Sequence, residues 1–231
     1  MTKSIVVGIA VGVLAYVAGS PMQAQDLQQK LAAAKQAAAL NQKAIRSYSW
    51  LEKTELSLKG EVKNTKVDMC KYGPDGKVQK TPVVEPPPPE EKRGLKGKIV
   101  AKKTGEMKDE LEAAVALVQH YVPPSPDKMQ VVMNAGTASI SQAGPGALTI
   151  AFPGYEKAND ALKITFDAAI TSLRQLDVVT WLEKPGEPVT LQVKMQSLPD
   201  GLNYPGSITL SIPSSQLEVR ITKSNYQKLA Q

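Results

Sequence analysis

Apolar and polar residues alternate along the chain from Gly146 to its end. The alternation is regular over residues 148–152, 162–166, 189–195 and 217–221. Successive side chains of a strand point to opposite faces, so a period of two predicts strands with one dry and one wet face. Proline and glycine between these strands predict turns that set neighbours side by side and antiparallel. These turn signals are Lys184-Pro185-Gly186, Pro199-Asp200-Gly201 and Tyr204-Pro205-Gly206.

A second extended region covers residues 48–83, with the sequence YSWLEKTELSLKGEVKNTKVDMCKYGPDGKVQKTPV. Lys59-Gly60 and Pro74-Asp75-Gly76 are strong turn signals that divide it into three segments. We predict three strands joined as a meander.

Helical periodicity replaces the alternation in two longer segments. The residues after Asp26 are rich in alanine and leucine, and their apolar positions keep helical spacing until about Ser47. A second helix is predicted from Thr104, with an apolar stripe and with acidic residues in its first half, where they would favour the helix dipole. Pro123 and Pro124 stop it.

A third, short helix is marked at both of its ends. Ser125 can cap it, Pro126 fits the first turn, and Gly136 can take the left-handed closing conformation. Its buried face is predicted to be Met129, Val132 and Met133.

Four consecutive prolines and a run of charges lie in KTPVVEPPPPEEKRGLKGK, residues 80–98. The strands on both sides need a cover for their dry faces, so neither half is expected to be stable alone. We therefore predict a single domain over residues 25–231 with a Pro-rich loop at 82–98, extended at first and then flexible. A solvated loop is the simpler interpretation. Contact with an envelope protein partner through this loop is the alternative.

The first residues, MTKSIVVGIAVGVLAYVAGSPMQAQ, have a basic start at Lys3, an apolar stretch and a small-residue exit. This pattern is typical of a signal peptide, here residues 1–24, and predicts a periplasmic or otherwise exported protein. The apolar stretch is shorter than the roughly 20 residues of a membrane span, so the mature chain is not expected to be an integral membrane protein. An uncleaved anchor is the alternative.

Charge and cysteine content limit the functions and the bonds that the chain can have. The chain has 28 basic and 22 acidic residues, and loss of Lys3 with the signal leaves 27 basic ones. This mild excess, scattered among acids, is not a nucleic-acid footprint. Cys70 is the only cysteine, so no internal disulfide can form and burial must hold the fold together.

No motif for catalysis, metal binding or a cofactor occurs in the sequence, which predicts a protein that is not an enzyme. Cys70 and His120, the only histidine, could form a nucleophile pair only if the fold brought them together. A strand cysteine is more often a small packing residue.

Together these elements predict an α+β fold, a strongly curved antiparallel sheet of about eight or nine strands, with the N-terminal helix and a two-helix lid on its dry, concave face. The closing strands LKITFDAAITSLRQLDVV, VTLQVKMQSLPDGLNYPGSITLSI and LEVRITKSNYQKL follow the N-terminal helix, meander and central helices. In this order the mature chain resembles the periplasmic outer-membrane lipoprotein-carrier superfamily, which is LolA-like. The resemblance implies an unclosed β-barrel that carries lipid tails between sheet and helices. The Pro-rich insertion departs from the family pattern.

The candidate site is therefore an apolar cavity rather than a set of polar groups. Methionine adapts its shape to variable apolar ligands, and tryptophan can form a cavity wall. The candidate cavity residues are Trp50, Leu56, Met107, Leu111, Met129, Val132, Met133 and Trp181.

Two functions from different classes fit this pattern. The first is an envelope protein that binds a lipid, an acyl chain or an acylated protein in a half-barrel cavity. The second is a non-enzymatic interaction or scaffold protein with the same fold and a filled core, since apolar stripes on helices over sheets usually pack.

Overall fold

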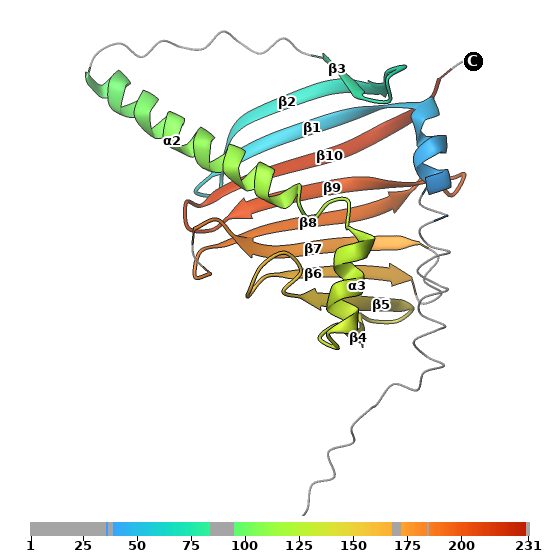
Figure 1. Ribbon diagram of the computed structural model, residues 1–231. Coiled ribbons are helices and arrows are strands. Elements are labelled where there is room, and N and C mark those ends of the chain that lie inside the picture. Colours follow the sequence, from blue (N-terminus) through green and yellow to red (C-terminus); the bar gives the residue numbers. More distant parts are fainter. Residues whose placement is uncertain (1–35, 37–38, 84–94, 168–171, 184, 230–231) are drawn as a thin grey trace, which may run out of the picture.

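The alternating segments pair into one sheet of ten antiparallel strands, in the order β3-β2-β1-β10-β9-β8-β7-β6-β5-β4 (Figure 1). The computed structural model describes residues 36, 39–83, 95–167, 172–183 and 185–229. The strands are β1 (Tyr48–Leu58), β2 (Glu61–Tyr72), β3 (Val78–Pro82), β4 (Ser139–Gln142), β5 (Ala147–Pro153), β6 (Ala161–Asp167), β7 (Leu173–Trp181), β8 (Pro188–Ser197), β9 (Asn203–Ile212) and β10 (Leu217–Lys228). The sheet is not closed, because β3 and β4 form its two edges.

Two α-helices, α2 (Leu95–Val118) and α3 (Pro126–Asn134), lie across the same face of the sheet (Figure 1). We call this face the inner face and the opposite one the outer face. Ala114 and Val118 of α2 and Val132 of α3 are buried in one hydrophobic cluster with residues of the strands. The α+β class and the unclosed antiparallel sheet expected from the sequence are thus confirmed, but the sheet has ten strands and not the eight or nine predicted.

The N-terminal helix is described from residue 39, and it ends in the 3-10 turn η1 (Ile45–Ser47). Asn41 fastens it to the start of β9, since its side-chain amide donates to the carbonyl of Asn203 (2.5 Å) and accepts from the N–H of Asn203 (2.6 Å). The described part of this helix therefore lies at the ends of the strands (Figure 1). The predicted signal peptide and the first part of the helix lie outside the described residues.

The meander at residues 48–82 forms as the turn signals predict. Lys59 and Gly60 have φ values of 54° and 78°, the left-handed pair that a tight hairpin between β1 and β2 requires. At the second turn the N–H of Gly76 donates to the carbonyl of Gly73 (2.9 Å). β2 and β3 then pair in antiparallel register from Tyr72 opposite Val78 to Asp68 opposite Pro82.

The predicted turn at Tyr204-Pro205-Gly206 is wrong, because these residues lie inside β9. The register with β8 shifts between Lys194 and Met195, next to Pro205. Proline is tolerated at such an irregularity, since it has no N–H to donate to the ladder. Gly206 lies close to another side chain rather than in a turn, because a Cβ there would lie 2.5 Å from Cδ of Gln196, which would have to move.

The second helix begins earlier than predicted. α2 starts at Leu95, so residues 95–98 are helical and not part of the Pro-rich loop, whose residues 84–94 lie outside the described residues. The acidic residues from Glu106 onward fall in the middle of α2, and its first turn has none, so the dipole argument does not hold. The start of α2 was not predicted, because Gly97 and Gly105 weaken the helical pattern of the sequence.

The third helix begins and ends as predicted. Ser125 Oγ accepts from the N–H of Lys128 (3.5 Å), Pro126 opens α3, and Gly136 has a φ of 69°. The strand β4 was not predicted, because its sequence carries no alternation. All four of its residues are exposed.

Candidate ligand site on the inner face

The inner-facing residues of β1 change in character along the strand. From the hairpin end they are Leu58, Leu56, Thr54, Glu52 and Trp50, which alternate positions place on one face. The leucines pack against the main hydrophobic cluster, whereas Glu52 and Trp50 are buried outside it. The inner face thus has an apolar end beneath α2 and a polar, aromatic end beyond it.

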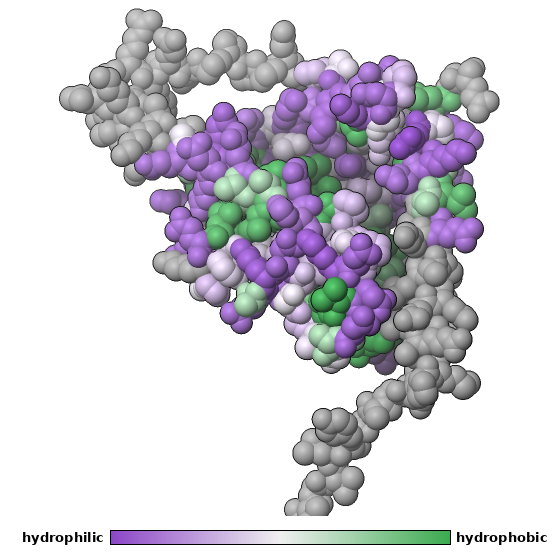
Figure 2. All heavy atoms as spheres, in the orientation of Figure 1, coloured by the Kyte–Doolittle hydropathy of each residue, from purple (hydrophilic) through white to green (hydrophobic). Residues whose placement is uncertain are grey.

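The apolar end is only partly covered. Its residues pack against the main cluster but remain partly exposed, and we call them the open apolar strip: Leu56 and Leu58 of β1, Ile208 of β9, Val219 of β10, and Met107 and Leu111 of α2. In Figure 1 α2 crosses β1, β10 and β9 at this end of the strands. The surface around the C-terminal half of α2 has green hydrophobic patches bordered by purple hydrophilic residues (Figure 2).

The neighbouring region under α3 is closed. The inner-facing residues of β5 to β8 are almost fully buried, among them Phe152 and Leu162 at 0% exposure and Val178 at 1%. Val132 of α3 is buried against them, with Met129 and Met133 packed beside it. Burial is therefore uneven along the inner face. The strands are almost fully buried under α3, although Met129, Met133 and Leu148 stay partly exposed there, and they are less buried under α2.

The structure brings most of the predicted cavity residues into one cluster. Leu56, Met107, Leu111, Met129, Val132 and Met133 all belong to the main hydrophobic cluster or pack against it. Trp50 and Trp181 do not. Trp181 lies at the end of β7, where its indole N–H donates to the carbonyl of Ala158 (3.3 Å) and the ammonium of Lys157 lies 3.7 Å from the ring centroid.

Beyond the apolar strip, five charged residues gather on the inner face of β1, β2, β3 and β10. We call them the inner charge cluster: Glu52, Lys66, Asp68, Lys80 and Lys223. Lys80 Nζ donates to Glu52 Oε1 (2.5 Å), and Lys223 Nζ lies 3.8 Å from Glu52 Oε2. Lys66 Nζ lies 3.0 Å from Asp68 Oδ2.

The two carboxylates of this cluster are buried, Glu52 at 3% and Asp68 at 1% exposure, while Lys66 and Lys80 have half-exposed side chains. Burial lowers the pKa of Lys223, although the charge of Glu52 opposes this. For Lys80 burial acts in the same direction, but the hydrogen bond and charge of Glu52 outweigh it, so its pKa is raised. Buried charges are costly unless they are paired, and perturbed groups of this kind concentrate at functional sites.

Two polar atoms at the cluster, Asp68 Oδ1 and Trp50 Nε1, are buried and have no hydrogen-bond partner among the residues that the structure describes. They come from neighbouring positions, because Trp50 lies opposite Cys70 and Glu52 lies opposite Asp68 in the β1–β2 ladder. A buried polar atom without a partner costs about 1–3 kcal/mol. The cluster therefore keeps one acceptor and one donor that a bound group could use.

Aromatic rings close the far side of the cluster. Trp50 stacks on Tyr226 with ring centroids 5.6 Å apart and packs against Tyr72 at 5.4 Å. Lys223 Nζ lies 5.5 Å from the Trp50 ring centroid. Trp50 is thus a wall of the charge cluster and not of the apolar strip.

Cys70 and His120 do not meet. Cys70 is buried in β2, and burial, followed by the charge of Glu52, raises the pKa of its thiol. His120 follows α2 and lies 3.5 Å from Glu156, in the loop between β5 and β6. The strands β1, β10, β9, β8 and β7 separate β2 from β6. Within the described ranges, no group of three or more His, Cys, Asp or Glu residues could hold a metal ion.

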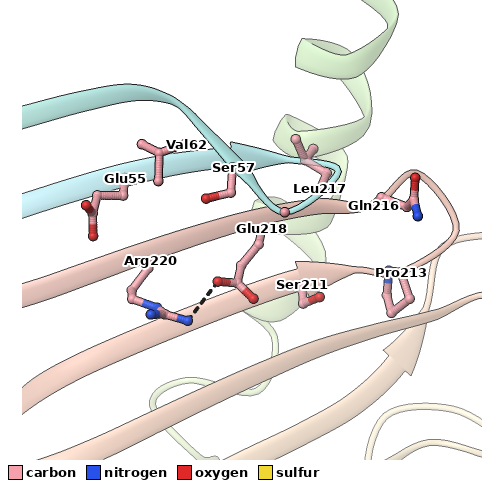
Figure 3. Close-up of a pocket in the computed structure, with 10 residues that line it drawn as sticks. Glu55, Ser57, Val62, Ser211, Pro213, Gln216, Leu217, Glu218 and Arg220 are labelled. Atoms are coloured by element: carbon pink, nitrogen blue, oxygen red, sulfur yellow. Dashed lines mark hydrogen bonds and ion pairs between the residues drawn. The ribbon is translucent and has the colours of Figure 1, made fainter.

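The outer face has a different surface. Two shallow hollows of about 400 and 540 Å³ share Ser211, Glu218 and Arg220 and are lined mainly by polar side chains. Glu218 and Arg220 point toward each other across the first hollow and form a 2.9 Å ion pair (Figure 3). Exposed pairs of this kind contribute little and need no ligand, so these hollows are the expected wet face of the sheet.

Sequence reasoning missed the inner charge cluster. A usable signal was present, because Glu52 is in phase with Trp50 and Leu56, and Asp68 is in phase with Cys70. A charged residue at a dry position of an alternating strand contradicts the binary pattern, and such contradictions are expected at functional sites.

In the parts of the chain that the structure describes, no helix is both long and apolar enough to cross a membrane. No family model, curated protein or solved structure matches the chain.

Proposed function

We propose that this protein binds a lipid, an acyl chain or an acylated protein on the inner face of its sheet, with the apolar chain lying along the open apolar strip. The observation that carries the proposal is the uneven burial of the inner face. Most inner-facing residues of the strands under α3 are almost fully buried, yet Leu56, Leu58 and Val219 under α2 stay partly exposed. Removing apolar side chains from water is favourable, and an acyl chain lying on these residues would remove them from water.

The composition of the strip suits a ligand of variable shape. Met107 and Leu111 are flexible, unbranched or γ-branched side chains on the helix side, and methionine adapts to different apolar partners. The helix side of the strip lies on α2, which is held by side-chain packing and not by the sheet ladder. The resemblance to lipoprotein carriers and the predicted export signal agree with a lipid-handling role in the cell envelope.

The scaffold function is the second candidate, and the sealed region under α3 favours it. A core that is almost fully buried from β5 to β8 is what a protein with a filled interior needs. The two candidate functions differ in whether the apolar strip under α2 binds a ligand or is packed.

A fluorescent fatty-acid probe distinguishes them. We expect saturable binding to the delipidated protein and displacement by natural acyl chains. Each buried methylene contributes about 0.8 kcal/mol, so affinity should rise about tenfold for every two carbons until the strip is filled. A scaffold with a filled interior would show neither saturation nor chain-length dependence.

Two tryptophan substitutions locate the binding region. Leu111→Trp adds volume over the partly exposed strip, so it should weaken probe binding and leave the free energy of unfolding nearly unchanged. Val132→Trp adds volume to the sealed region and should cost about 1–3 kcal/mol by overpacking, with probe binding retained in the folded fraction. Thermal unfolding and probe titration measure both effects. If both variants lose the same stability, the strip is packed and the binding proposal fails.

A further inference from the structure

We infer that the inner charge cluster is a headgroup site, which takes a phosphodiester bearing hydroxyl groups, as in a glycerol-type phospholipid headgroup. This inference rests on the proposed function, because it assigns the polar part of the ligand whose acyl chain lies on the strip.

The placement of the two regions fits an amphipathic ligand. Glu52 and Leu56 are four residues apart on the same face of β1. At about 3.3 Å per residue their Cα atoms are about 13 Å apart, and only Thr54 separates the charge cluster from the apolar strip on this face. A lipid whose chain lies along the strip would bring its headgroup to the cluster.

The charges of the cluster call for an anionic group. Three lysines face two carboxylates, which leaves one positive charge in excess. Glu52 is engaged by Lys80 and Lys223, but the contact to Lys223 is long, at 3.8 Å. A phosphate oxygen near Lys223 would give this largely buried ammonium a full partner, and Trp50 Nε1 could donate to the same group.

The unpartnered acceptor adds a second requirement. Asp68 Oδ1 is buried and accepts no hydrogen bond from any described residue, and Oδ2 is engaged by Lys66. A ligand that only accepts hydrogen bonds, such as a fatty-acid carboxylate or a phosphocholine, cannot satisfy it. A hydroxyl on the headgroup can donate to it. An ammonium could do so as well, but it would add a positive charge to a cluster that already has an excess.

The headgroup can reach these atoms past flexible side chains. Lys66 and Lys80 cover the two carboxylates, and their side chains are 49% and 45% exposed. Lysine has a long stem with several rotatable bonds, so the ammonium groups can move aside and then contact the phosphate.

Short-chain lipids test the inference in solution. Dihexanoyl phosphatidylglycerol is compared with dihexanoyl phosphatidylcholine and phosphatidylethanolamine on the full mature protein by calorimetry. We expect phosphatidylglycerol to bind about tenfold more tightly than phosphatidylcholine, which has the same phosphate and no donor, with phosphatidylethanolamine between them. Equal affinity for all three would overturn the headgroup site while leaving the acyl-chain proposal standing.

Variants assign the preference to the cluster. Lys223→Met should lower affinity for all three lipids about tenfold, and Asp68→Ala should bring the ratio between phosphatidylglycerol and phosphatidylcholine close to one. Lys194→Met, an exposed lysine of β8, is the matched control and should change neither value. Binding of the fatty-acid probe should be unchanged in Lys194→Met, whereas Lys223→Met should weaken it, because the probe's carboxylate would also lie at the cluster. A loss of headgroup preference in the control, or its retention in Asp68→Ala, would contradict the assignment.

A measurement on the wild-type protein keeps the test independent of variant folding. The two indole N–H signals in an NMR spectrum come from Trp50 and Trp181, and only Trp50 borders the cluster. Soluble glycerophosphoglycerol should shift the Trp50 signal and leave that of Trp181 in place. If this shift occurs while no acyl probe binds, the headgroup site stands and the proposed function falls. If saturating phosphatidylglycerol leaves the Trp50 signal unmoved, the headgroup site is wrong.

Discussion

At the scale of single residues, Tyr121 holds the junction between α2 and α3 onto the sheet. Its side chain is fully buried, and its hydroxyl group lies 2.5 Å from Asp160 Oδ2 and 2.8 Å from Thr180 Oγ1. Asp160 also accepts from the N–H groups of Glu156 and Lys157. This network connects the helices to β6 and β7 by hydrogen bonds in addition to apolar packing.

Replacement of Tyr121 by phenylalanine tests this anchor. Tyr121→Phe keeps the ring but removes a hydrogen bond to a buried carboxylate, so we expect a loss of about 2 kcal/mol in the free energy of unfolding. Tyr155→Phe is a matched control. The Tyr155 hydroxyl accepts one bond, from the Ser125 N–H at 2.6 Å, so the loss there should be about 1 kcal/mol. Equal losses in urea unfolding would argue against a special role for Tyr121.

The same hydroxyl gives the stability a pH dependence. Burial and the hydrogen bond to Asp160 raise the pKa of Tyr121 above its ordinary value of about 10. Below pH 10 the phenol is protonated in both the folded and the unfolded state, so its contribution is complete. Above pH 10 only the unfolded state releases the proton, so stability falls as pH rises. The stability difference between wild type and Tyr121→Phe should therefore shrink above pH 10.

At the scale of elements, the sequence predicts the strands well because each signal is local. The period of two identifies β5, β6, β8 and β10, and glycine with positive φ marks the hairpins. The start of α2 and the strand β4 depend on tertiary context. Leu95 begins a helix despite two nearby glycines, and β4 is a short polar edge whose pairing to β5 supplies its structure.

The candidate site was predictable in part for the same reason. Helical stripes reveal that Met107 and Leu111 face the sheet, but the degree of burial depends on how α2 lies across the strands. No local pattern encodes that angle. The inner charge cluster needs the register of β1, β2, β3 and β10, which joins residues from Glu52 to Lys223.

Replacement of glycine by alanine at two positions tests the local rules, and the two effects on stability should be opposite. Gly60→Ala places a side chain at a φ of 78°, which should cost about 1–2 kcal/mol even though no atom lies within 4 Å of the new Cβ. Gly105→Ala in α2 also meets no atom within 4 Å, and it should stabilise the protein by about 0.5–1 kcal/mol, because alanine favours the helix. Thermal unfolding of both variants measures the difference. A destabilising Gly105→Ala would argue against a helix at this position.

At the scale of the whole molecule, the pairing of β1 with β10 joins the first strand of the sheet in the sequence to the last one. The register runs from Leu58 opposite Leu217 to Tyr48 opposite Lys228. The aromatic contact between Trp50 and Tyr226 reinforces it on the inner face. The meander before the Pro-rich segment is therefore an integral part of the ten-stranded sheet, since without β10 it would expose an additional edge.

Cleavage in the Pro-rich segment tests whether the parts before and after it form one domain. Trypsin should cleave the folded protein after Lys92 or Arg93, whereas Lys98 lies inside α2 and should be protected. The two fragments should still elute together in gel filtration, because the β1–β10 ladder and its side chains hold them, and they should separate only in denaturant. A variant with Lys92→Gln and Arg93→Gln is the control and should resist the cut. Fragments that separate without denaturant and unfold at different temperatures would mean that the chain has two domains, and the inner face would then have to be divided between them.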